Sequence, residues 1–152
     1  MPYHADIAVY GKDERLQLLV ETKSKRSTSQ DWAAKMRRNM YAHGLLPEAQ
    51  FFLLALPDKF YLWKNIGLST EIVNSSYEIS SESFLQPYYT KAGVSLSEIT
   101  GRSFELIVSA WLREVMGLQS ADSLPQDYRD WFVSSGLFDA IQGGRLESEV
   151  LV

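Results

Sequence analysis

The sequence predicts an α/β domain in which a mixed sheet of four or five strands is flanked by helices, with a helical C-terminal part. In residues 1–64, short apolar runs lie on both sides of one amphipathic stretch, and residues beyond 79 have helical periodicity. The 152 residues with 45% apolar content are enough for one sizeable core. We therefore expect a single domain over 1–152, with a sheet core in 1–79 and a helical extension in 80–152.

Two antiparallel strands joined by a tight turn are predicted at the N-terminus. Residues 3–10 and the apolar run 16–20 have the length and composition of strands. Residues 11–15 between them are polar and begin with glycine, which is typical of a hairpin. With a loop of two or four residues, the register places Asp6 directly opposite Glu21.

The ends of these two strands carry a candidate metal site. Glu21 and Lys23 share one face because side chains alternate along a strand. Directly opposed carboxylates repel, so Asp6 and Glu21 call for a cation, either the Lys23 ammonium or a bound metal. Mg²⁺ prefers oxygen ligands, and beside Lys23 it would suit phosphodiester cleavage. The alternative is a plain ion pair at a strand end.

One helix and two strands follow along the chain. Polar residues 27–29 offer caps for a helix over 30–43, in which His43 is expected to interact with the helix dipole. The continuous apolar run 50–56 predicts a central strand covered on both faces, and a turn leads into a strand over 60–64. The aromatic residues of that last strand are expected to pack in the core rather than stack on a base.

This order of elements resembles the PD-(D/E)xK superfamily of restriction-endonuclease-like nucleases. Asp6 matches the motif aspartate, and Glu21, Thr22 and Lys23 match (D/E)xK. Residues 3–64 carry the resemblance. Within the superfamily they are most similar to the nuclease domains of type I restriction subunits and related uncharacterised proteins.

The resemblance implies a restriction-endonuclease-like fold and metal-dependent cleavage of nucleic acid. It implies that Asp6 and Glu21 are ligands of Mg²⁺ or Mn²⁺, that the Thr22 backbone carbonyl is a third ligand, and that Lys23 is catalytic. Gln30 corresponds loosely to a helix glutamine found in several of these families.

The chain departs from the family pattern in two ways. Ala5 stands where the family's proline often stands, and only residues 1–5 precede Asp6, where members usually have a helix. We therefore expect C-terminal helices or a second subunit to cover the sheet face that this helix usually occupies. The second subunit would make the protein a homodimer; the alternative is that these residues are part of a larger polypeptide.

The sequence pattern of the C-terminal part predicts helices. Residues 65–79 read as a loop with a short strand near 71–73, and the tail 145–152 alternates weakly, as an edge strand does. A capping-box pattern, Ser95-x-x-Glu98, precedes the longest apolar stripe, which ends at Gly117. The other helices are expected over 81–89, 126–134 and 137–141. Aromatic side chains on the helices are expected to form a dimer surface if no core buries them: Trp111, Trp131 and Phe132.

The net charge of −4 is unevenly distributed. Residues 23–38 hold six cations against one acid, whereas residues 92–152 hold nine acids against four arginines. Basic side chains beside a carboxylate pair would hold phosphates near the metal. The expected nucleic-acid-binding residues are Lys25, Arg26, Gln30 and Lys35. A solvated helix face is the alternative for the lysine and arginines within 35–38.

The amino-acid composition excludes several classes of protein chemistry and location. The sequence has no cysteine, which excludes disulfides, thiolate catalysis and cysteine-held metal clusters. It shows no secretory leader and no apolar run of membrane-spanning length, so a cytoplasmic location without membrane contact is expected. We expect an Mg²⁺-dependent endonuclease acting on DNA, in restriction or repair. The alternative is a catalytically inactive nuclease-fold module that binds nucleic acid or protein.

Overall fold

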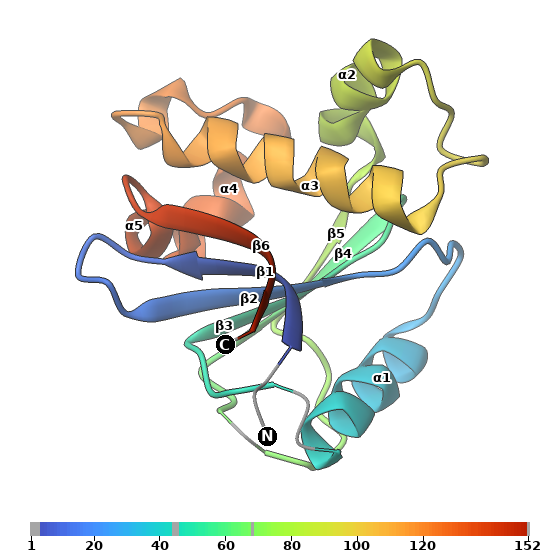
Figure 1. Ribbon diagram of the computed structural model, residues 1–152, viewed down its shortest axis with the longest axis vertical. Coiled ribbons are helices and arrows are strands. Elements are labelled where there is room, and N and C mark those ends of the chain that lie inside the picture. The colour runs from blue at the N-terminus through green and yellow to red at the C-terminus, as the bar shows by residue number, and fades with distance from the viewer. Residues whose placement is uncertain (1–3, 44–45, 68, 152) are drawn as a thin grey trace.

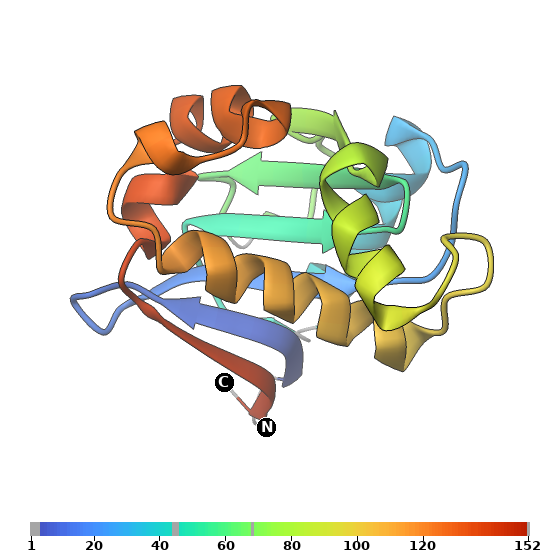
Figure 2. The same cartoon turned by 90° about the horizontal axis from the view of Figure 1, so that it is seen from above.

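The computed structural model describes residues 4–43, 46–67 and 69–151 and shows three layers (Figure 1). A mixed sheet lies in the middle, α1 covers one face, and the later helices cover the other (Figures 1 and 2). The elements in chain order are β1 (His4–Tyr10), β2 (Leu16–Thr22), α1 (Gln30–Ala42), β3 (Phe51–Ala55), β4 (Lys59–Lys64), β5 (Tyr77–Ser80), α2 (Glu82–Ala92), α3 (Gly101–Met116), η1 (Ala121–Ser123), α4 (Gln126–Ser134), α5 (Leu137–Ile141) and β6 (Arg145–Leu151).

The sheet has six strands in the order β5-β4-β3-β2-β1-β6. Only β2 and β3 are parallel, because α1 connects them as a crossover, and all other neighbours are antiparallel. The expected mixed α/β architecture is thus confirmed, with one strand more than the four or five expected. The sheet has six strands because a short strand after residues 65–76 pairs at one edge and the C-terminal tail pairs at the other.

The β1–β2 hairpin has the predicted register but not the predicted loop. The pairing ends with Ile7 opposite Val20, and the same register, extended by one residue, places Asp6 opposite Glu21. The turn closes with the Gly11 amide donating to the Arg15 carbonyl, so the loop between them has three residues, and one of these, Glu14, has a φ of 66°. Loops of this length commonly hold one left-handed residue. A register shift between Val9 and Tyr10 compensates for the odd loop length.

Local signals account for several helix ends. The Ser29 hydroxyl accepts a hydrogen bond from the Trp32 amide at 3.2 Å and caps α1. α3 ends before Gly117 as expected, but Thr100 rather than Ser95 caps its start, accepting from the Ser103 amide. α4 and α5 have the predicted bounds. The strand expected near 71–73 is instead β5, where alternating half-buried side chains pair with β4.

The two sheet faces support two cores. Every residue of β3 is buried, because one face packs under α1 and the other under the later helices. Trp111 and Phe132 are completely buried among aromatic side chains, and Trp131 is half-buried against the same cluster, so these three side chains pack on a core within this chain. The sheet face expected to lack a helix is therefore covered by α2 to α5, and β6 pairs with β1 at the neighbouring edge (Figure 2).

No helix in the described part of the chain combines the length and apolarity needed to span a membrane.

Candidate active site

The candidate site lies where β1 and β2 separate. Their backbone pairing runs from Tyr10 with Leu16 to Ile7 with Val20. Beyond this point side chains replace backbone partners. The Asp6 amide donates to Oε1 of Glu21 at 3.4 Å.

Thr22 fixes the Asp6 carboxylate from the other strand. Its backbone amide donates to Oδ2 of Asp6 at 2.8 Å, and its hydroxyl donates to the same oxygen at 3.1 Å. The structure therefore brings together three of the residues expected from the sequence, Asp6, Glu21 and Thr22. The carboxylate of Asp6 takes the place of a backbone acceptor for the Thr22 amide, and this contact orients the carboxylate.

The environment of Glu21 is unusual for a surface acid. Burial and repulsion by the Asp6 carboxylate, in that order, raise the pKa of Glu21 to about 8, and a hydrogen bond between the two side chains adds to this effect. The Asp6 amide and the Lys23 ammonium lower the pKa, but by less. Glu21 therefore holds a proton at neutral pH unless a cation lies beside it.

Lys23 extends β2 by one further contact. Its backbone amide donates to the carbonyl of Ala55 at 3.1 Å, which keeps β2 alongside β3 beyond its last paired residue. The Lys23 side chain is exposed, and it lines the same pocket as Glu21. The acid and the amine thus open onto one space, as alternation along the strand predicts.

This pocket has a volume of about 390 Å³, and α1 and the segment after it supply its other wall. That wall consists of Met36, Asn39, Met40, His43 and Leu46. The sequence indicates no chemistry for His43, because a histidine before a glycine is ordinarily a helix end. No local pattern in the sequence shows that the C-terminal turn of α1 lines the same pocket as Glu21.

The two carboxylates fit a hard divalent cation. Asp6 and Glu21 present oxygen ligands, and burial and repulsion by Asp6 together raise the pKa of Glu21 despite the nearby Lys23 ammonium. Among the described residues, no three His, Asp or Glu side chains converge as a metal-binding group. Mg²⁺ commonly binds one or two carboxylates and keeps waters or substrate phosphates as its other ligands. The carbonyl of Thr22 remains the expected third protein ligand.

The predicted nucleic-acid-binding residues have different surroundings. Lys25 and Arg26 are exposed on the loop between β2 and α1, and the Lys25 ammonium lies 5.3 Å from the centre of the Trp32 ring. Lys35 is exposed as well, but it forms an ion pair with Asp31 at 3.0 Å. The loop pair thus offers more positive charge to a phosphate than Lys35 does.

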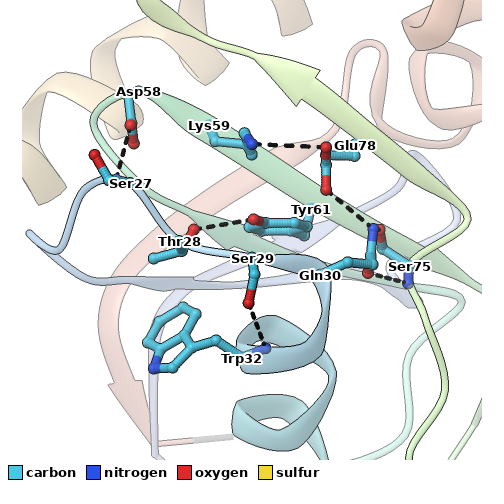
Figure 3. A network of polar contacts seen from close by, with 10 residues as sticks. All are labelled: Ser27, Thr28, Ser29, Gln30, Trp32, Asp58, Lys59, Tyr61, Ser75 and Glu78. Carbon is cyan, nitrogen blue, oxygen red and sulfur yellow. Dashed lines mark hydrogen bonds and ion pairs between the residues drawn. The ribbon is translucent and has the colours of Figure 1, made fainter.

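Gln30 has a structural function at the start of α1 (Figure 3). Its amide nitrogen donates to the Ser75 hydroxyl at 2.8 Å and to Glu78, and its amide oxygen accepts from the Ser75 backbone at 2.8 Å. Glu78 in turn pairs with Lys59 on β4. These contacts join α1 to β5 and to the segment that precedes it.

The loop that carries the basic pair is anchored at its far end (Figure 3). The Ser27 amide donates to the Asp58 carboxylate at 3.0 Å, and the hydroxyls of Thr28 and Tyr61 are 2.9 Å apart. Tyr61 is itself buried in the sheet. Anchoring on the β3–β4 turn and on β4 therefore holds Lys25 and Arg26 near the end of β2.

Arg37 does not belong to the basic surface. It is buried, it donates to the carbonyls of Gly67 and Ser69 at 2.9 and 3.0 Å, and it lies over the Tyr41 ring. Burial lowers the pKa of Arg37 below its ordinary value. Its role is to hold the segment after β4 against α1, so the surface charge of this region is smaller than a count along the sequence indicates.

Comparisons of the chain with protein-family models, with curated proteins and with solved structures found no match. The chain is an α/β protein with a mixed sheet, and the separating ends of β1 and β2 hold two carboxylates with an amine and a basic loop beside them.

Proposed function

We propose that this chain is a nuclease that depends on Mg²⁺ or Mn²⁺ and hydrolyses phosphodiester bonds of DNA. The observation that carries the proposal is the meeting of Asp6 and Glu21 at the separated ends of β1 and β2. Burial of Glu21, and after it repulsion by the Asp6 carboxylate, raise the pKa of Glu21 to about 8. Two carboxylates this close to each other destabilise the folded state when both are charged. A bound cation removes this repulsion.

The residues of the site have separate roles in cation binding and in catalysis. Asp6, oriented by Thr22, and Glu21 hold the cation. When bound, a cation of this kind polarises a phosphate oxygen and lowers the pKa of a coordinated water. The Lys23 ammonium lies at the same pocket and stabilises the negative charge that develops on the phosphate during attack.

The basic loop supports a polyanionic substrate. Lys25 and Arg26 are exposed beside the strand end that carries Lys23. The acidic part of the chain, beyond residue 91, lies mostly in helices on the opposite sheet face. Phosphates are therefore attracted to the face that carries the two carboxylates and repelled by the other.

The rival function is a binding module that keeps this scaffold without cleavage. The hydrogen bonds of Gln30 and the ion pair of Lys35 reduce the expected contacts to nucleic acid under either function. Both functions predict DNA binding by the loop. Only the nuclease predicts that Asp6 and Lys23 matter for bond cleavage.

A plasmid-nicking assay separates the two functions. We expect the parent protein to nick supercoiled DNA with Mg²⁺ or Mn²⁺ and not with EDTA, and we expect Asp6→Ala and Lys23→Ala each to slow nicking about a hundredfold or more. Asp127→Ala and Lys91→Ala, both exposed on the helical side, are the matched controls. Equal nicking by Asp6→Ala and the parent would exclude this site as the catalyst.

A further inference from the structure

The pocket beside the carboxylate pair has the properties of a binding site of its own. It adjoins the proposed site, since Glu21 and the exposed Lys23 line it together with residues of α1. Its volume of about 390 Å³ lies at the low end of the range for small-molecule sites, about 300–1,000 Å³. A pocket of this size accepts one planar ring system with its sugar and excludes a double helix.

The floor of the pocket is apolar and adaptable. Met36, Met40 and Leu46 contribute it, and two of these, Met40 and Leu46, are buried. Methionine side chains are unbranched and polarizable, and they make favourable contacts with aromatic rings. A flat aromatic ligand therefore matches this floor better than an aliphatic or a highly charged one does.

The rim supplies both kinds of hydrogen-bonding group. Nδ1 of His43 lies 3.2 Å from the carbonyl oxygen of Asn39. A carbonyl oxygen only accepts, so a hydrogen bond at this distance needs the hydrogen on Nδ1, and in that tautomer Nε2 is an acceptor. The side-chain oxygen of Asn39 accepts from Arg38 at 3.0 Å, while its amide nitrogen provides donors.

We propose that this pocket holds one base of the substrate strand, next to the phosphate that is cleaved. This inference rests on the proposed function and names a subsite for it. The exposed Lys23 attracts the phosphate, the methionines contact the face of the base, and Asn39 and His43 contact its edge. Every base edge presents donors or acceptors that such a rim can meet.

An unstacked base is the consequence of this geometry. A base inside the pocket has left its neighbours in the strand, and unstacking costs least in single-stranded DNA, at frayed ends or at mismatches. The protein is therefore expected to cleave single-stranded or frayed DNA faster than a continuous duplex.

A binding experiment without metal tests the pocket separately from cleavage. A short single strand containing one 2-aminopurine is titrated with protein in EDTA, and its fluorescence reports unstacking and burial of that base. We expect a fluorescence change with the parent, and about tenfold weaker binding with the double variant Asn39→Ala/His43→Ala. Both residues are exposed, so the fold is retained, and Asn74→Ala, an exposed asparagine outside the pocket, is the control. A full response from the double variant would overturn the proposal.

A cleavage experiment tests the same subsite in the proposed reaction. Oligonucleotides with an abasic site placed in turn at each position are compared by kcat/KM. We expect one position beside the cleaved bond at which base removal lowers kcat/KM about tenfold in the parent and not in the double variant. Cleavage that ignores every abasic position would overturn the base subsite and leave the nuclease standing. A 2-aminopurine response without cleavage of any substrate would support the subsite and contradict the nuclease.

Discussion

The backbone amide of Thr22 donates a hydrogen bond to Oδ2 of Asp6 at 2.8 Å, and its hydroxyl donates to the same oxygen. A residue of β2 thus orients the carboxylate of β1 at the point where the two strands separate. The neighbouring acid, Glu21, is held by the Asp6 amide. Each strand therefore positions the acid of the other, so the site depends on the hairpin register rather than on any flexible loop.

Removal of the Thr22 hydroxyl is expected to loosen Asp6 without unfolding the protein. Thr22→Val keeps the shape and the backbone donor but loses the hydrogen bond at 3.1 Å. We expect the free energy of unfolding to fall by about 1 kcal/mol and kcat to fall more than KM changes. Urea denaturation and steady-state kinetics measure these effects, with the exposed Thr90→Val as control. Unchanged kcat in Thr22→Val would show that the backbone amide alone orients Asp6.

The raised pKa of Glu21 predicts a pH-dependent loss of stability. The pKa is about 8 in the folded protein, against an ordinary value of 4.5, so between these values the folded state keeps a proton that the unfolded state releases. Stability therefore falls as pH rises through this window, and the loss is complete above its upper limit. Glu21→Gln removes the titrating group, and with it this pH-dependent loss of stability.

Denaturation at about pH 5 and about pH 9 checks this prediction. We expect Glu21→Gln to gain stability relative to the parent on going from the lower to the higher pH. The exposed Glu71→Gln should follow the parent. Parallel pH profiles for the parent and Glu21→Gln would contradict the burial and repulsion described for Glu21.

The same proton is expected to compete with a cation. A cation that binds Asp6 and Glu21 displaces the proton of Glu21, so affinity for Mn²⁺ should rise about tenfold per pH unit below pH 8 and level off above it. Isothermal titration in buffers of different ionisation enthalpy measures the proton release directly. Glu21→Gln should bind Mn²⁺ weakly and without this slope; a slope that persists in the variant would assign the proton to another group.

The basic loop is expected to determine the salt dependence of DNA binding. Lys25→Ala and Arg26→Ala should each reduce the slope of log K against log salt by about 0.7 to 0.9, the value for one phosphate contact. Lys35→Ala should reduce it less, because Asp31 already neutralises part of that charge. Fluorescence anisotropy with labelled DNA at several salt concentrations measures the slopes. Lys91→Ala on α2 is the control, and an equal slope change there would indicate nonspecific attraction.

Local patterns in the sequence determined the N-terminal hairpin, its register and the bounds of two helices. The alternation in residues 3–10 and 16–23 predicted the hairpin and its register, and helix periodicity with flanking glycine and proline predicted the bounds of α4 and α5. The meeting of Asp6 with Glu21 followed from that register. These features could be predicted because capping, turn formation and alternation involve residues close together in the chain.

Only the tertiary structure decided the rest. It paired β6 with β1, whose residues lie more than a hundred positions away in the chain, replaced the expected strand near 71–73 with β5, and placed His43 in the pocket that Glu21 lines. It also buried Arg37, which sequence alone counts as a surface charge, and raised the pKa of Glu21. Strand neighbours, pocket walls and burial depend on contacts between distant segments, and local sequence patterns contain no information about which distant segments meet.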